Sequence, residues 1–485
     1  MSKFQQIGFY RDPKKAGYQL LPFNFTRLAG QEYVLTNAVG ESLVLPRDKL
    51  ETFINRGLSK IHSEYDDLKS KHFLMDDDSS VALDLLALKT RTKLQFLKNF
   101  TSLHIFVVSL RCEHSCHYCQ VSRQSDDRLA FDMSEESARR AVDLVFRSPS
   151  PAIKIEFQGG EPLLNFERIR QIVAWAKERN LAEQRNLQFV IATNLALITD
   201  EHLEFCKEHS ILLSTSLDGP EDLHNKNRPR PGRDSHQRVV AGIRRARAAL
   251  GHDRVSALMT TTQASLPRVR EIIDEYVRQE IDGIFLRPLS PYGFAVKTKA
   301  ISAYNRDAWF NFYKEGLAQI IEINRKGKRF VEFYSTVILT KMLTPFTPGY
   351  VDLVSPAGIG IGALVYNYDG DVYASDEGRM LAEMGDKKFR LGNLLTDSYE
   401  DIIYSETLLD ALEESFAASA PMCSECAFEP FCGADPVYHY ATQKDFVGKK
   451  PLSDFCNRHM AMCRHLIALM REDPEVKDIF LSWVQ

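Results

Sequence analysis

The chain has 485 residues, of which 44% are hydrophobic and 26% charged, as expected for a soluble globular protein of about two to four domains. Its 61 basic and 65 acidic residues give a formal net charge of −4, so the composition gives no support for binding to nucleic acid or to an anionic membrane. There is no apolar run near the roughly 18–20 residues of a membrane span and no secretory signal at the start. We therefore expect a cytoplasmic protein, whose clustered cysteines are metal ligands or catalysts rather than disulfides.

Residues 1–95 contain no cysteine and predict a small α+β domain. Residues 33–36 and 42–45 have the composition of two short strands. Two amphipathic helices follow and extend to about Lys71. A polar break at 75–80 predicts a linker to the next domain.

Residues 100–300 alternate strand and helix patterns. Amphipathic helices, such as the one that Ser134 would cap, separate the strands. This order predicts an α/β fold with a parallel sheet, open or closed as a barrel, in which functional groups gather at the carboxyl ends of the strands. Six largely apolar runs are the predicted parallel strands: 103–110, 153–157, 187–193, 212–217, 255–261 and 283–289.

A group of three cysteines follows the first of these strands directly. Cys112, Cys116 and Cys119 have the spacing C-x3-C-x2-C. Three thiolates on one loop can hold three irons of a [4Fe–4S] cluster and leave the fourth iron open to another ligand. The alternative is zinc, with His114 or His117 as the fourth ligand.

This loop, with aromatic Tyr118 before its last cysteine, resembles the radical S-adenosylmethionine (SAM) superfamily. Gly159-Gly160-Glu161-Pro162 after the second strand resembles the GGEP motif of the same family, whose backbone and glutamate bind the SAM amino group. Glycine allows close approach of the backbone, and a carboxylate suits an ammonium group. The resemblance implies that the open iron chelates SAM, that Tyr118 packs near the adenine, and that SAM is cleaved to a 5′-deoxyadenosyl radical.

Polar residues at later strand ends are expected to face the same pocket. The stretch 214–220 resembles the SLDGP segment of peptide-modifying members of the family, and Asp218 within it is a catalytic candidate. Arg228 is expected to meet the SAM carboxylate, and Arg287 needs a partner on an otherwise apolar strand. Each of them has a structural role as its alternative. The pocket candidates from these segments are Asn194, Ser214, Ser216, Asp218, Arg228 and Arg287.

Residues 301–350 predict a helical connection, and a second cysteine group lies within 351–485. Its four thiolates could hold a [4Fe–4S] cluster with no open iron, or zinc. With the hairpin-like stretch 368–373, these cysteines resemble the SPASM domain, which carries auxiliary [4Fe–4S] clusters. The predicted ligands are Cys423, Cys426, Cys432 and Cys456.

The second group departs from the fuller SPASM pattern. Relatives often have a cysteine where this chain has Ala374-Ser375-Asp376, and another where it has Pro436. We therefore expect one auxiliary cluster rather than two. Asp376 or Asp435 is the alternative ligand for a second one.

Longer stretches, among them 156–166, 374–380 and 432–438, resemble the B-type radical SAM maturase of the His-Xaa-Ser system. This resemblance implies a precursor peptide as substrate, together with an electron donor and a second radical SAM maturase or a small accessory protein. The N-terminal domain resembles a winged-helix peptide-recognition domain that would capture a peptide as an added strand. Its alternative role is to cap the barrel.

The sequence thus predicts a partial (β/α)6 radical SAM barrel with a winged-helix-like N-terminal domain and a SPASM-type C-terminal domain. The predicted function is modification of a ribosomally synthesised peptide by hydrogen abstraction, forming a side-chain cross-link. One alternative is oxidation of a Ser or Cys in a protein, as in sulfatase maturation. The other is a zinc-stapled, peptide-binding scaffold without catalysis.

Overall fold

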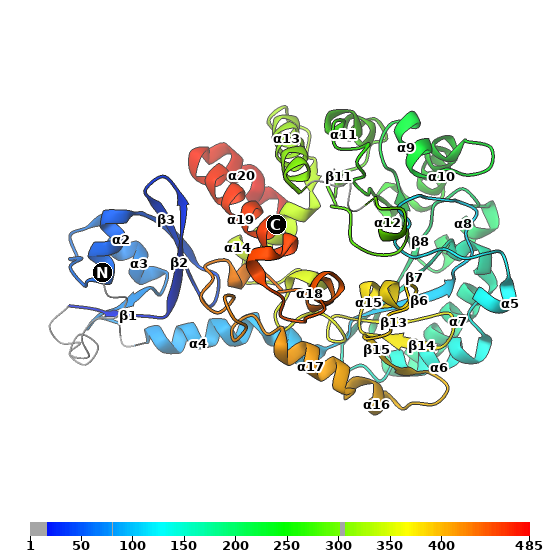
Figure 1. The fold of residues 1–485 in the computed structure, drawn as a ribbon, viewed down its shortest axis with the longest axis horizontal. Helices are drawn as coiled ribbons and strands as arrows, with labels where there is room; N and C mark the ends of the chain where they lie inside the picture. Colours follow the sequence, from blue (N-terminus) through cyan, green and yellow to red (C-terminus); the bar gives the residue numbers. More distant parts are fainter. Residues whose placement is uncertain (1–16, 80, 301–305) are drawn as a thin grey trace.

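The computed structural model describes residues 17–79, 81–300 and 306–485, without the side chain of Arg306 (Figure 1). The beginning of the chain, where we expected no secretory signal, lies outside the described residues. So does 301–305, the start of the predicted helical connection. Among the described helices, none is both long enough and apolar enough to span a bilayer.

The N-terminal domain is a three-stranded antiparallel sheet with two helices and forms a separate lobe in Figure 1. Tyr18, Phe53 and Phe73 are part of its own apolar core. Both predicted strands and both predicted helices are present, and three further strands, β2 and the short β1 and β5, were not predicted. The elements are β2 (Phe23–Ala29), β3 (Glu32–Asn37), β4 (Ser42–Pro46), α2 (Arg47–Ile54) and α3 (Ser63–Ser70), with the short pair β1 (Gln19–Leu20) and β5 (Leu74–Met75).

A long helix, α4 (Ala82–Lys93), leads from this lobe beneath the main body (Figure 1). The sequence did not predict it because its apolar side chains do not form one stripe. Leu83, Leu85 and Leu88 are exposed, and only Leu86 is buried among its described residues.

Five parallel strands form the centre of the molecule in the order β10-β9-β8-β7-β6. Along β7, Ile153, Ile155 and Phe157 belong to the core shared with the covering helices, and alternate residues such as Glu156 and Gln158 face the interior of the partial barrel. The strands are β6 (Leu103–Ser109), β7 (Ala152–Gly159), β8 (Asn186–Ala192), β9 (Leu212–Ser216) and β10 (Val255–Leu258). The main covering helices are α6 (Glu135–Val145), α7 (Phe166–Glu183), α8 (Asp200–Glu208), α10 (Ser235–Leu250) and α11 (Val269–Arg278).

The predicted α/β fold is confirmed, but its last two strands are shorter than expected. The fifth ends at Leu258 rather than at residue 261. The sixth is a strand only at β11 (Gly283–Ile284), which pairs with β12 (Val331–Glu332) instead of β10. The buried carboxylate of Glu332 accepts a hydrogen bond from the Leu286 amide at 3.0 Å, so this backbone group is satisfied without a further strand partner.

The C-terminal part extends the same sheet. The predicted hairpin is β13 (Ala363–Tyr366) and β14 (Asp371–Tyr373), and β13 also pairs in parallel with β6. The sheet ends with β15 (Arg390–Asn393), which makes eight strands within the described part of the chain. Four helices lie between the barrel and the N-terminal lobe (Figure 1): α13 (Arg306–Arg325), α14 (Phe333–Leu343), α19 (Asp454–Glu472) and α20 (Pro474–Trp483). The first two are the helices predicted in the connection.

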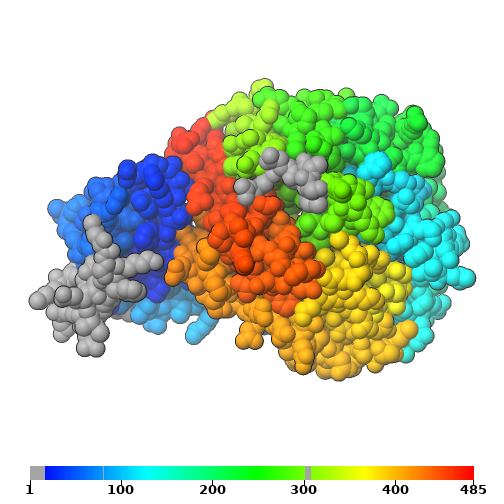
Figure 2. Space-filling view, viewed as in Figure 1, coloured from blue at the N-terminus to red at the C-terminus, as the bar shows by residue number. Residues whose placement is uncertain are grey.

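The N-terminal lobe contacts the C-terminal cysteine-rich segment, and Figure 2 shows it against the orange and red part of the surface. The Thr36 hydroxyl donates to the Ala427 carbonyl at 2.5 Å, and the Asn24 amide donates to the Ser424 carbonyl at 3.0 Å. The lobe is therefore held beside the second cysteine group.

Candidate functional site

The three cysteines after β6 line one cavity of about 220 Å³. Backbone hydrogen bonds fix their loop: the Cys119 amide donates to the Cys116 carbonyl at 3.2 Å, and the Phe294 amide donates to the Cys119 carbonyl at 2.8 Å. Burial raises the pKa of the Cys116 thiol to about 12. A thiolate in this loop therefore needs a positive charge, such as a metal centre, beside it.

The carboxyl ends of four neighbouring strands form the walls of this cavity, as in other parallel α/β folds. A Cβ on Gly159 would lie 1.9 Å from the Ser109 carbonyl oxygen, and one on Gly160 would lie 2.3 Å from that of Arg111, so only glycine fits there. The structure brings these candidates to the cavity with the cysteines: Tyr118, Gly159, Gly160, Asn194, Ser214, Ser216 and Arg228.

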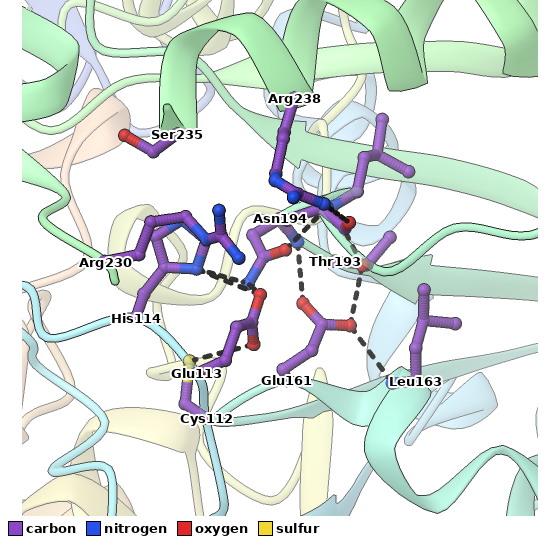
Figure 3. Close-up of polar contacts among 12 residues, drawn as sticks. Cys112, Glu113, His114, Glu161, Leu163, Thr193, Asn194, Arg230, Ser235 and Arg238 are labelled. Atoms are coloured by element: carbon purple, nitrogen blue, oxygen red, sulfur yellow. Dashed lines mark hydrogen bonds and ion pairs between the residues drawn. The ribbon is translucent and has the colours of Figure 1, made fainter. Parts of the chain in front are cut away.

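Glu161 and Pro162 lie behind the cavity wall and do not line it. The Glu161 carboxylate accepts hydrogen bonds from the Thr193 hydroxyl at 2.7 Å, the Asn194 amide at 2.9 Å and the Leu163 amide at 3.0 Å (Figure 3). It therefore connects the end of β7 to the end of β8 and holds Asn194 in place.

A second carboxylate, which the sequence analysis did not single out, stands beside the first cysteine. Glu113 accepts from the Asn194 side chain at 2.8 Å, contacts His114 Nδ1 at 3.0 Å, and lies 3.9 Å from Cys112 Sγ (Figure 3). Burial and the negative charge of Glu113 both raise the pKa of Glu161. Glu113 escaped notice because a charged residue inside a cysteine loop is ordinary.

Asp218 lies beneath the cavity rather than on its wall. It accepts from the Tyr118 hydroxyl at 2.6 Å and from Arg228 Nε at 3.0 Å. Burial alone would raise the pKa of Asp218, but Arg228 and His224 hold it below the usual value of 3.8. In this geometry the carboxylate positions Tyr118 and Arg228, two residues that do line the cavity.

Arg287 is not part of this wall. Its guanidinium is 3.9 Å from Glu377 Oε1, in a separate group of charged residues. The Arg287 side chain is 32% exposed. Glu377 is the charged partner that we expected for Arg287 on an otherwise apolar strand.

The second cysteine group lines another cavity, of about 310 Å³. Cys423, Cys426 and Cys432 come from one irregular segment, and Cys456 comes from the first turn of α19. Cys463 is buried two turns further along, 3.7 Å from His459 Nε2, and does not line the cavity. Cys206 is buried in α8 and lines neither cavity.

The residues that replace the missing SPASM cysteines have structural roles here. Ser375 caps α15 (Asp376–Ala382), and Asp376 pairs with Arg379 at 2.7 Å. Asp435 caps α18 (Pro436–Gln443), with Pro436 in its first turn.

Both cavities have the donors that iron–sulfur clusters require. The first presents three thiols, two glycines that expose their backbone, and the buried Thr215 hydroxyl, which has no hydrogen-bond partner among the residues that the structure describes. The second presents four thiols in a mostly apolar wall. Three thiols beside a polar pocket suit a cluster with an open iron, and four suit a closed one.

The family model of the radical SAM superfamily matches residues 106–278. The chain is 22% identical over 391 residues to the serine-type anaerobic sulfatase-maturating enzyme of Bacteroides thetaiotaomicron, covering 75% of this chain and 88% of that one. Among solved structures, native anSMEcpe with bound AdoMet is similar with a TM-score of 0.63 and 17% identity, covering 79% and 99% of the two chains.

Streptococcus suis SuiB bound to precursor peptide SuiA is also similar, with a TM-score of 0.50, 15% identity and coverage of 89% and 98%. These two structures support the fold over 79% and 89% of this chain, beyond the segment that the family model covers. The family match shows that residues 106–278 are a radical SAM domain, so this chain is a radical SAM enzyme, whose cofactors are a [4Fe–4S] cluster and SAM.

Proposed function

We propose that this enzyme is a peptide maturase that modifies a ribosomally synthesised precursor peptide and forms a side-chain cross-link. The observation that carries the proposal is the pair of cysteine-lined cavities, one with three thiols and a polar pocket and one with four thiols. Similarity to SuiB, which was solved with a precursor peptide, supports a peptide substrate.

In this proposal Cys112, Cys116 and Cys119 hold the SAM-binding cluster, and Tyr118 and Arg228 bind SAM. The cluster and SAM, when bound, supply a radical that abstracts a hydrogen atom from an unactivated carbon. The chain's own residues orient SAM: Asp218 fixes both Tyr118 and Arg228 through hydrogen bonds of 2.6 and 3.0 Å. The interior of the barrel excludes bulk water from the reaction.

The second cavity would hold one auxiliary [4Fe–4S] cluster that accepts or relays the electron left after bond formation. Its four ligands would be Cys423, Cys426, Cys432 and Cys456. The acidic alternatives are used otherwise, since Asp376 pairs with Arg379 and Asp435 caps α18. This supports one auxiliary cluster rather than two.

The domains expected at 1–95, 100–300, 301–350 and 351–485 remain part of the proposal, with the N-terminal domain capturing the peptide. Among the described strands, β4 pairs only with β3, so its other edge has no strand partner, although its Ser42 carbonyl accepts a hydrogen bond from Lys71 Nζ at 2.8 Å. A groove of about 520 Å³ runs along β4, between apolar Met342, Leu343 and Met470 and basic Lys71, Arg471 and Lys477. An extended peptide could add to this edge.

Amide hydrogen exchange tests this role. In the presence of a precursor peptide encoded beside the gene, exchange should slow along β4 and stay unchanged along β2. If β4 shows no protection while the peptide binds elsewhere, the lobe is a cap.

Iron and sulfide content after anaerobic reconstitution tests the two-cluster proposal. The wild type should hold about eight irons, and the Cys112/Cys116/Cys119→Ala variant about four. A fall from about four to none would contradict the auxiliary cluster. Zinc in place of iron, in a colourless protein, would favour the non-catalytic scaffold.

Sulfatase-maturase-like oxidation is the second candidate, supported by the relative from Bacteroides thetaiotaomicron. The mass and chemistry of the product separate the two reactions. A cross-link removes two hydrogens and creates a ring that survives carbonyl reagents. Oxidation of Ser or Cys leaves an aldehyde that those reagents trap.

A further inference from the structure

A cavity of about 150 Å³ shares Glu429 and Cys432 with the cavity of the second cysteine group, and two lysines line it. Lys93 comes from the last turn of α4, and Lys341 comes from the last turn of α14. The Lys93 ammonium donates to the Pro430 carbonyl at 3.1 Å, and the Lys341 ammonium donates to the Cys432 carbonyl at 3.2 Å. The two ammonium groups are therefore anchored on carbonyls two residues apart in the chain, at the wall of one cavity.

Neither ammonium group has a carboxylate partner among the residues that the structure describes. Lys341 is 5% exposed, and its other hydrogen bond goes to the Leu353 carbonyl. The carboxylate that lines the cavity is Glu429, which forms an ion pair with neither lysine. Burial lowers the pKa of Lys93 to about 8 although Glu429 acts to raise it. Two buried positive charges near one another are unfavourable until an anion joins them.

A hydroxyl group without a partner lines the same cavity. The Thr347 Oγ1 atom is buried, and it makes no hydrogen bond with any described residue. Thr347 comes from the loop that follows α14. A hydroxyl and two ammonium groups around one cavity are donors that suit a carboxylate, and a carboxylate oxygen there would also satisfy the buried hydroxyl.

This lysine cavity is the inner end of a row of three hollows. The groove along β4 shares Glu41, Met342 and Leu343 with a second groove, of about 400 Å³. The second groove in turn shares Lys93 and Lys341 with the lysine cavity. Because neighbouring hollows share lining residues, an extended chain that pairs with β4 has a path to the two lysines.

The row carries more positive than negative charge, although the whole chain has a net charge of −4. Lys89 and Arg471 pair with Glu41 and Glu32. The other cations of the row have no carboxylate partner in the described part of the chain: Lys71, Lys93, Lys341 and Lys477. Among the carboxylates that line the row, Glu429 alone is unpaired, so an occupant with acidic side chains would complement the row.

We propose that Lys93, Lys341 and the Thr347 hydroxyl bind a carboxylate of the peptide substrate, on an acidic segment that extends from the edge of β4. The peptide would be held at two points, by its backbone on β4 and by an acidic side chain beside the second cysteine group. This inference rests on the proposed peptide-modifying function and names the charge of the segment that the N-terminal lobe captures.

The test uses the reconstituted full-length enzyme and blocked decapeptides of five Thr-Xaa pairs, with Xaa as Glu, Gln or Lys. Threonine favours the extended conformation that pairing with β4 requires. Equilibrium dialysis at pH 7 should show that the Glu peptide binds about 10-fold more tightly than the Gln peptide. The Lys peptide should bind more weakly than the Gln peptide, because its charges repel the lysines of the row.

Substitutions in the lysine cavity should remove this preference. The double variant Lys93→Gln/Lys341→Gln should bind the Glu and Gln peptides equally. Thr347→Val should reduce the preference about threefold. It removes a hydroxyl that has no hydrogen-bond partner in the described chain, so this variant tests the site without breaking a contact of the fold.

Lys207→Gln is the matched control. It removes a lysine charge from the exposed surface of α8, and Lys207 lines none of the three hollows. It should keep the full preference. Equal binding of the Glu and Gln peptides by the wild type, or a preference that survives the double lysine variant, would overturn the inference. An equal loss in Lys207→Gln would also overturn it, because the preference would then depend on net charge alone.

SAM binding and modification of the precursor peptide, measured on the same samples, separate this inference from the proposed function. If the enzyme binds SAM and modifies the precursor but shows no preference for the Glu peptide, the carboxylate site fails alone. If the reconstituted enzyme neither binds SAM nor modifies the precursor, the proposed function fails and the inference fails with it.

Discussion

The two cysteine-lined cavities differ in how their thiols are supplied and in what surrounds them. Three thiols of the first lie within eight residues of one loop, and polar strand ends form the opposite wall. The four thiols of the second come from an irregular segment and a helix, and Met422, Phe428 and Met460 are among the apolar residues around them. An incomplete set of thiols thus occurs beside polar strand ends that can bind a small molecule, whereas the complete set lies in a mostly apolar wall that also includes Glu429, Lys450, Asn457 and His459.

Removing two thiols of the second cavity should give the largest difference between the two cavities. We expect Cys432→Ala with Cys456→Ala to remove about four irons and to lower product formation about 100-fold. SAM binding should stay within about twofold of the wild type, because the first cavity keeps its loop. Iron analysis, SAM dialysis and product mass spectrometry check this.

Cys206→Ala is the matched control for the loss of a thiol. Cys206 is buried in α8, and neither cavity includes it. It should keep all the iron. If the double variant lost SAM binding as well, the two sites would not be independent.

Gly160→Ala should disturb the first cavity and leave the second one intact. Its Cβ would lie 2.3 Å from the Arg111 carbonyl oxygen, so the strand end must move, at a cost of about 1–3 kcal/mol in the free energy of unfolding. SAM should bind at least about 10-fold more weakly, while the C-terminal irons remain. Gly57→Ala is the control, because its new Cβ would lie 3.5 Å from the nearest atom, Thr52 Cγ2. This variant should keep the SAM affinity of the wild type.

Asp218→Asn tests whether the first cavity depends on a charge beneath its wall. The variant leaves Arg228 without its carboxylate partner, and we expect a loss of about 3 kcal/mol in the free energy of unfolding.

The pH dependence of this difference has a definite sign. Because Arg228 and His224 keep the pKa of Asp218 below 3.8 against the effect of burial, its contribution is fully present above the unfolded-state pKa. The stability difference between wild type and variant should therefore be constant above about pH 5 and shrink as the pH falls through the folded pKa. Urea unfolding between pH 3 and 7 measures it. A difference that grows toward low pH would contradict the assignment.

Thr36→Val should give the smallest effect, at the contact that holds the N-terminal lobe beside the second cavity. It removes the hydroxyl that donates to the Ala427 carbonyl, which should cost about 1 kcal/mol. Limited proteolysis between the lobe and the barrel should become faster. Thr52→Val, at an exposed hydroxyl of α2 that bonds only the Asp48 carbonyl of its own helix, should leave the cleavage rate unchanged.

The sequence was most informative where one physical cause acts alone. Buried parallel strands require apolar runs, so β6 to β9 were found close to their true bounds. Thiol spacing likewise identified both cysteine groups. The pattern failed where tertiary contacts decide: β11 is short because Glu332 occupies the Leu286 amide.

In the site, too, some features could be predicted from the sequence and others could not. Glycine positions follow from close backbone approach, and Gly159 and Gly160 do line the first cavity. Glu161 lies behind the wall because three donors from the chain itself surround its carboxylate.

The pairing of β13 with β6 has a consequence for how this protein can be divided. The strand that leads to the first cysteine loop is completed by a strand from the C-terminal region. A chain cut near residue 350 would present β6 as a bare edge, ready to pair with strands of other molecules. The catalytic barrel and the cysteine-rich tail are therefore not exchangeable modules, and expressing the barrel alone should give an aggregating protein rather than a simpler enzyme.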